Sequence, residues 1–206
     1  MIQHLLRLFR YRLLISSLVG RELKARYRGS VLGFLWSFIN PLLLLLTYGL
    51  VFKYVFPGAR PQGMEPYFLF LVCGLLPWTW FQSSIAEAAG VLIAGGNLIK
   101  KVLFPAEVLP VVTVLANLVH FLLGLPIVLL FLIWFGRLRP SALLLPLPLL
   151  VQLVFTVGLA LFFSALTVHF RDLQDILSHL LHLWFWGSPI LYFYGDMTGT
   201  VKTALR

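Results

Sequence analysis

The sequence contains little charge and very little acid. Of its 206 residues, 11% are charged and 60% are hydrophobic, whereas soluble domains carry about 25% charged residues. This composition excludes a water-soluble globular protein. The sequence has seven acidic residues and 16 Lys and Arg. This excess of positive charge does not by itself indicate nucleic-acid binding, because a binding patch needs a solvated protein face. The single cysteine, Cys73, excludes an intrachain disulfide.

Motifs for phosphate, dinucleotide and metal chemistry are also missing. An ATP-binding loop needs G-x-x-x-x-G-K-[ST], and the nearest string, GVLIAGGN at 90–97, lacks the lysine. The sequence has no G-x-G-x-x-G, no H-E-x-x-H and no Cys/His metal spacing. It therefore predicts that the chain itself hydrolyses no ATP and holds no cofactor or metal.

Long uncharged runs define the organisation of the chain. Five runs reach the roughly 20 apolar residues that cross a membrane as a helix, and none reaches the roughly 40 needed for two crossings. We therefore expect an all-α polytopic membrane protein with a transmembrane domain over 29–195 and a short tail over 196–206. Residues 88–99 are expected to form a separate interfacial segment. The five expected transmembrane helices cover about 31–52, 66–86, 108–135, 142–168 and 176–194.

The basic residues predict the orientation. The first 28 residues hold seven of the 16, and segments rich in Lys and Arg stay on the cytoplasmic side of a membrane. We therefore expect a multi-pass protein of the cytoplasmic (inner) membrane with its N-terminus in the cytoplasm. Within residues 1–28, apolar residues recur at helical spacing between basic ones, which is typical of an amphipathic interfacial helix. The alternative is a solvated basic face.

The densest polar cluster lies where the fifth expected span begins. Its members are three or four residues apart and share one helix face. Such a face could hold a metal or relay protons in a membrane enzyme. Alternatively, the two acids cap the helix N-terminus, and the deeper histidines either pack in the bundle or line a water-filled path. The cluster comprises His169, Asp172, Asp175, His179 and His182.

Stripes of small or polar residues predict how the spans pack, because such residues let membrane helices approach each other. A G-x-x-x-G formed by Gly29 and Gly33 is a weak motif for the same purpose. Four tryptophans lie near mid-span, where an interfacial aromatic belt does not explain them, and we expect them to fill the bundle core. They are Trp78, Trp80, Trp184 and Trp186. The stripes are Ser37, Asn40 and Thr47 in the first span, Thr113, Asn117, His120 and Gly124 in the third, and Gln152, Thr156, Ala160 and Ser164 in the fourth.

Three strings are informative beyond their physical chemistry: RELKARYRGSVLGFLWSFINPLLLLLTYGLVF at 21–52, GNLIKKVLFPAEVLPVVTVLANLVHF at 96–121 and HFRDLQDILSHLLHLWFWGSPILYF at 169–193. In order and spacing they resemble the polysaccharide-exporting branch of the type 2 ABC transporter permeases. This resemblance implies a permease subunit that pairs with a second copy of itself and with separate ATPase subunits, which bind the ATP. It also implies export of lipid-linked polysaccharide such as O antigen, capsule or teichoic acid.

The resemblance further implies roles for individual residues. It implies a cytoplasmic gate helix, formed by Arg21, Glu22, Lys24, Arg26, Tyr27 and Arg28. It implies a coupling helix that docks on the ATPase, formed by the segment around Lys100, Lys101, Phe104, Pro105 and Glu107. Because aromatics of the fifth span line the family's channel, it favours a translocation path along Trp184, Trp186, His179 and His182.

The chain also departs from that family. Family members continue through a sixth span, whereas this sequence stops at Arg206, so we expect a truncated form. Two other functions stay open on the residues alone. One is a permease for drugs or small lipids on the same architecture, and the other is a membrane-embedded enzyme that acts on lipid-linked sugars through the His169–Asp175 face.

Overall fold

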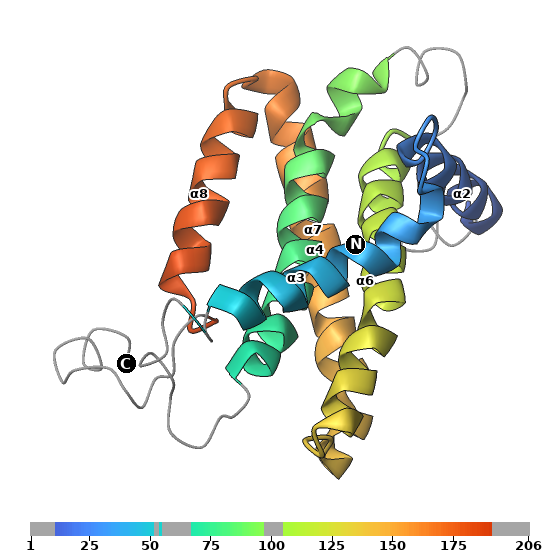
Figure 1. Ribbon diagram of the computed structural model, residues 1–206. Helices are drawn as coiled ribbons and strands as arrows, with labels where there is room; N and C mark the ends of the chain where they lie inside the picture. Colours follow the sequence, from blue (N-terminus) through green and yellow to red (C-terminus); the bar gives the residue numbers. More distant parts are fainter. Residues whose placement is uncertain (1–10, 52–53, 55–66, 97–104, 191–206) are drawn as a thin grey trace, which may run out of the picture.

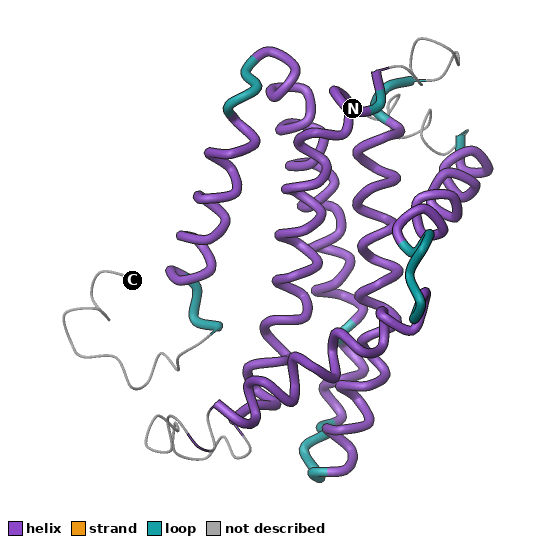
Figure 2. The backbone as a smooth tube through the Cα atoms, turned by 45° about the horizontal axis from the view of Figure 1, so that its top comes forward, coloured by secondary structure: helices purple, strands orange, loops and turns teal. Residues whose placement is uncertain are grey.

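The computed structural model describes residues 11–51, 54, 67–96 and 105–190, and these form helices with no strand among them (Figure 1, Figure 2). The predicted all-α fold is confirmed for this part of the chain. Two short 3-10 helices, η1 and η3, precede α3 and α7. The elements are α2 (Arg12–Arg26), η1 (Gly33–Leu35), α3 (Trp36–Leu50), α4 (Tyr67–Ala94), α6 (Val108–Trp134), η3 (Pro140–Leu144), α7 (Pro146–His169) and α8 (Leu173–Gly187).

Four helical stretches in the described residues are long and apolar enough to cross a membrane. They are Gly33–Leu50, Tyr67–Ala94, Val108–Trp134 and Pro140–His169, at the places of the first four expected spans. Helix α8 has 15 residues, or about 22 Å of helix, which is less than the roughly 30 Å hydrocarbon core. Because 191–194 of the fifth expected span lie outside the described residues, the count of five stays a prediction.

The second span differs from its prediction. The uncharged run predicts an end at 86 and a separate interfacial segment from 88 onward, but α4 continues through Glu87 to Ala94. A charged residue is tolerated within an apolar helix when it has partners. Glu87 has them on two other helices, so its charge does not end the span.

Helices α4, α6 and α7 form the centre of the bundle, with α2 beside α6 and α8 beside α4 (Figure 1). Helix α3 runs obliquely across α4 and α6 (Figure 1). Small side chains permit the central packing, since Ala88 of α4 and Ala160 of α7 are both 0% exposed and belong to one core cluster. Thr156 and Ser164 are buried on the same face of α7. The stripe predicted for the fourth span is therefore a helix-packing face.

The turn between α2 and α3 corrects the prediction made from the G-x-x-x-G motif. Gly29 and Gly33 have φ angles of +81° and +49°, in the left-handed region that favours glycine. A Cβ added at either would meet nothing within 4 Å, so neither glycine permits a close helix approach. The pair instead allows the chain to reverse. Ser30 completes the turn, because its Oγ accepts hydrogen bonds from Gly33 N and Trp36 Nε1, both at 3.2 Å.

Gly124 does provide a close approach, between α6 and α3. A Cβ there would lie 3.0 Å from Pro41 Cγ and 3.4 Å from Leu76 Cδ1. We predict that Gly124→Val lowers the melting temperature of the detergent-purified protein, because overpacking destabilises by roughly 1–3 kcal/mol. Gly158→Val in α7 is the matched control, since a Cβ at Gly158 would meet nothing within 4 Å. Equal melting temperatures for the two variants would contradict this packing of α3 on α6.

Candidate functional site

Helix α2 is held against α6 by an apolar contact. Ile15 and Leu18 are buried and pack on Val108 and Val112. Because Arg26 follows Ile15 by about three helical turns, it lies on the same side of α2. The end of α2 is therefore directed into the bundle.

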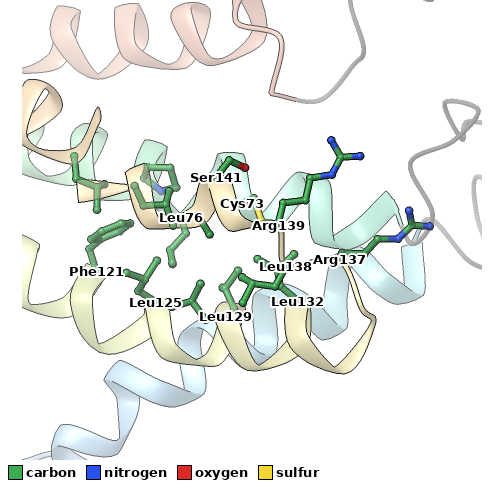
Figure 3. A pocket seen from close by; sticks show the side chains of 15 residues that line it. Cys73, Leu76, Phe121, Leu125, Leu129, Leu132, Arg137, Leu138, Arg139 and Ser141 are labelled. Atoms are coloured by element: carbon green, nitrogen blue, oxygen red, sulfur yellow. The ribbon is translucent and has the colours of Figure 1, made fainter. Parts of the chain in front are cut away.

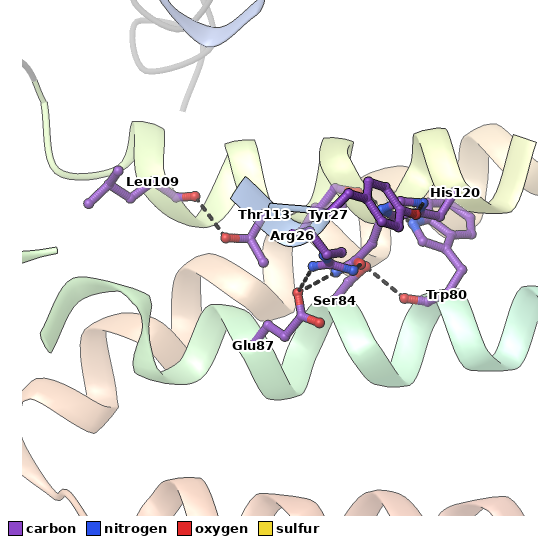
Figure 4. Close-up of polar contacts among 10 residues, drawn as sticks. Arg26, Tyr27, Trp80, Ser84, Glu87, Leu109, Thr113 and His120 are labelled. Atoms are coloured by element: carbon purple, nitrogen blue, oxygen red, sulfur yellow. Dashed lines mark hydrogen bonds and ion pairs between the residues drawn. The ribbon is translucent and has the colours of Figure 1, made fainter. Parts of the chain in front are cut away.

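The Arg26 guanidinium joins three helices. Its Nη1 donates to Asn117 Oδ1 of α6 at 2.9 Å, and its Nη2 donates to Glu87 Oε2 of α4 at 2.7 Å. Asn117 Nδ2 donates to the same carboxylate oxygen at 2.9 Å. Each side chain thus contacts both others (Figure 4). We call this group the Arg26–Glu87–Asn117 clamp.

Burial differs among the members of the clamp. The side chains of Arg26 and Glu87 are 31% and 41% exposed, so the surroundings screen their ion pair. Asn117 is only 4% exposed, and a buried amide that loses its partners leaves unsatisfied polar atoms. The clamp therefore depends most on the hydrogen bonds of Asn117, whereas the two charges orient it.

Tyr27, the residue after α2, makes a second polar contact. Its hydroxyl lies 2.6 Å from Ser37 Oγ and 2.9 Å from His120 Nδ1. Ser37 Oγ lies 3.1 Å from the same nitrogen. The rings of Tyr27 and His120 meet edge to face with centroids 5.5 Å apart. The end of α2 is thereby tied to α3 through Ser37 and to α6 through His120.

A cavity of about 520 Å³ opens between α2, α3, α4 and α6 beside these groups. Within the described residues, the buried His120 Nε2 has no hydrogen-bond partner, and such an atom favours a bound water or a polar ligand group. Glu87 offsets the charge of Arg26 at this cavity. Trp36 adds an aromatic group, whereas Trp80 is 3% exposed and stacked on Phe121. This lining suits a neutral, sugar-like polar ligand. The polar lining includes Arg26, Tyr27, Ser30, Trp36, Ser37, Asn40, Thr79, Trp80, Ser83, Asn117 and His120.

The residues predicted for the gate helix divide into two groups. Arg26 and Tyr27 have the bundle contacts described above. The others are exposed on α2 or in the turn that follows it, and they are Arg21, Glu22, Lys24 and Arg28. Two of the six predicted residues therefore hold α2 against the bundle, and the other four lie on the surface.

The residues predicted for the translocation path lie on α8, and they too divide. The Trp184 ring lies edge-on against Trp78 of α4, with centroids 6.0 Å apart. Trp186 is 66% exposed, and both predicted histidines, His179 and His182, are exposed. The two tryptophans are thus directed differently, as two residues about 200° apart on a helix must be.

The acids at the start of α8 agree with their predicted positions but not with the predicted hydrogen bond. Asp172 is the N-cap residue and Asp175 lies in the first turn, yet Asp172 makes no side-chain capping hydrogen bond. Their negative charges still lie at the positive end of the helix dipole. No three His, Cys, Asp or Glu side chains in the described residues are grouped as metal ligands. The described residues on this face of α8 therefore offer no metal site for the membrane-embedded enzyme considered above.

The predicted coupling helix falls mostly outside the described residues. Lys100, Lys101 and Phe104 lie there, whereas Pro105 precedes α6 and Glu107 is its N-cap residue. The segment that contains them connects the end of α4 to the start of α6.

Sequence reasoning missed Glu87 and gave Asn117, His120 and Ser37 packing roles only. A signal for Glu87 exists in the sequence. It is a lone acid in a long apolar stretch, and an ionisable residue within a membrane span indicates a functional site by default. The polar stripe on the third span contains Asn117 and His120 but does not identify their partners.

We predict that Asn117→Leu loosens α2 from the bundle. The variant loses both hydrogen bonds of a buried amide, which destabilises by about 1–3 kcal/mol. Melting should occur at lower temperature, and trypsin should cleave faster at the exposed Arg21 and Lys24. Thr113→Val is the control on the same helix, since Thr113 Oγ1 donates to Leu109 O of α6 itself. Equal cleavage rates in the two variants would count against the clamp.

Similarity to known proteins extends over almost the whole chain. The ABC-2 type transporter family matches residues 14–204. The O-antigen export system permease protein RfbA of Myxococcus xanthus is 46% identical over 194 residues, which cover 93% of this chain and 73% of that protein. The RfbA protein of Klebsiella pneumoniae is 40% identical over 182 residues, with coverages of 87% and 68%.

A more distant relative belongs to another polysaccharide system. The polysialic acid transport protein KpsM of Escherichia coli is 24% identical over 182 residues, which cover 86% of this chain and 69% of that protein. The matched region contains the four helices that are long and apolar enough to span a membrane, together with the clamp. The chain is a multi-pass membrane protein and belongs to the ABC-2 type transporter family.

Proposed function

We propose that the chain is the permease subunit of an ABC exporter that carries lipid-linked polysaccharide, O antigen or a similar glycan, across the cytoplasmic membrane. Similarity to an O-antigen export permease over 93% of the chain carries this proposal. ATP is bound and hydrolysed by a separate ATPase subunit, since the sequence has no ATP-binding loop motif. Two copies of the chain together form the path for the polysaccharide.

The orientation in this proposal follows the basic residues. Seven of the 16 lie in the first 28 residues, which places α2 and the N-terminus in the cytoplasm. The segment between α4 and α6 then also lies on the cytoplasmic side, and the turn after α6 lies outside. The clamp is accordingly at the cytoplasmic end of the bundle, where an ATPase subunit can act.

The clamp connects the proposed coupling segment to the gate helix. Glu87 lies about two turns before the end of α4, and Asn117 lies about two and a half turns after the start of α6, or some 10–13 Å from the segment in each case. A push on the segment therefore displaces two helices that both hold Arg26. Since packed elements move as rigid bodies, ATP-driven motion reaches α2 through these three side chains.

The exposed face of α8 supports a path between two copies. His179 and His182 are exposed there, and histidines facing lipid are unfavourable, whereas those facing a water-filled path are not. Large apolar side chains are exposed on the same helix, where a second copy can cover them. They are Ile176, Leu180, Leu183, Trp184 and Trp186.

The proposal is tested in a bacterium that lacks its own O-antigen permease. Expression of the chain together with its ATPase should restore polysaccharide at the cell surface, and expression of either one alone should not. Charge reversal at Lys100 and Lys101 combined with Phe104→Ala should weaken copurification of the ATPase. Charge reversal at Lys53 and Arg60, on the opposite side of the membrane under this orientation, is the control and should leave copurification unchanged. Restoration without the ATPase would overturn the proposal.

We predict different effects for the two tryptophans of α8. Trp186→Ala should abolish export and lower the melting temperature less than Trp184→Ala does, because Trp186 is 66% exposed and shares a helix face with His179 and His182. Trp184→Ala should lower the melting temperature, because its contact with Trp78 is lost and aromatic pairs contribute about 0.5–1.5 kcal/mol each. Normal export by Trp186→Ala, with export lost in a stable Trp184→Ala variant, would reverse the assignment.

A further inference from the structure

A second cavity, of about 340 Å³, lies near the other end of α6. Its walls come from α4, α6, η3 and the first turns of α7, and Figure 3 shows them from close by. The volume is within the roughly 300–1,000 Å³ of small-molecule sites. None of the three clamp residues lines this cavity, so the transport mechanism proposed above does not explain it.

The lining is almost entirely apolar and extends along α6. It runs from Phe121 near the middle of the helix to Leu132 near its end, a distance of about 16 Å. This is close to half of the roughly 30 Å hydrocarbon core, which is the depth of one leaflet. The cavity therefore matches the length over which a lipid acyl chain lies in a single leaflet. The other apolar residues include Leu125, Leu129, Leu145 and Leu149.

Two arginines stand at the rim of the cavity. Arg137 and Arg139 follow the end of α6 and are exposed. Figure 3 shows both guanidinium groups at one end, directed away from the apolar side chains. The described residues that line the cavity include no Asp or Glu. The position after a membrane-spanning helix is the level at which lipid headgroups lie.

We propose that this cavity binds an anionic phospholipid of the adjoining leaflet. One acyl chain lies along α6 between Phe121 and Leu132, and the phosphate is bound by Arg137 and Arg139. Guanidinium groups match phosphate with paired, charge-assisted hydrogen bonds, and basic groups beside membrane spans attract anionic headgroups. In addition to the surface charge, the cavity provides an apolar site for the acyl chain next to the position of the phosphate.

Native mass spectrometry of the purified protein, released from nanodiscs of mixed phosphatidylglycerol and phosphatidylcholine, tests the affinity. The unaltered chain should retain phosphatidylglycerol. The double variant Arg137→Gln and Arg139→Gln should retain it about tenfold less, since loss of charge-assisted hydrogen bonds weakens binding by at least that factor. The control Arg28→Gln with Arg171→Gln removes two exposed arginines elsewhere and should leave retention unchanged. Equal retention by all three proteins would overturn the proposal.

Cys73 reports where the lipid lies. It is the single cysteine of the chain, it is exposed, and it lines this cavity. N-ethylmaleimide should modify it more slowly in phosphatidylglycerol than in phosphatidylcholine nanodiscs. This protection should be lost in the Arg137→Gln, Arg139→Gln variant and kept in the control variant, which separates a bound lipid from a general effect of bilayer charge.

Two further results would overturn the proposal. Equal rates of Cys73 modification in both lipids would show that the acyl chain lies elsewhere. Displacement of the retained phosphatidylglycerol by a polyprenyl diphosphate, with Cys73 still protected, would assign the cavity to a transported lipid carrier instead of a membrane phospholipid. Because none of these measurements requires export or an ATPase, failure of the proposed function would leave the test valid.

Discussion

The hydrogen bonds around the Arg26 guanidinium determine how three helices of this bundle sit together. Asn117 is only 4% exposed, so its amide must find hydrogen-bond partners within the protein, and Arg26 and Glu87 are those partners. Glu87, which is 41% exposed, pairs with the same guanidinium. The length of α4 beyond Glu87, the alignment of α4 with α6 and the position of α2 therefore depend on one set of contacts.

The sequence predicts the central helices well and the site poorly. The expected span 108–135 coincides with α6, at Val108–Trp134, because no charged residue interrupts the sequence between Glu107 and Arg137. The same criterion fails for α4, since Glu87 is charged but paired. Its partner Arg26 is 61 residues away and Asn117 is 91 residues from that arginine, and helical periodicity carries no information over such separations.

The two halves of α6 differ in chemistry. The first half, from Val108 to about Phe121, carries the polar cavity with Arg26 and His120. The other carries the apolar cavity with Arg137 and Arg139 at its rim. Phe121 lines both. A single helix thus has one half suited to polar ligands and the other suited to lipid.

A charge exchange between the two ionic members of the clamp tests this account most directly. Melting temperatures would be measured for Arg26→Glu, Glu87→Arg and the combined variant. Each single change places like charges together beside Asn117 and should destabilise the protein. The combined variant restores an opposite pair, and the Asn117 amide can turn to serve either arrangement, so stability should recover with a clear coupling energy. A combined variant no more stable than the weaker single variant would contradict the account.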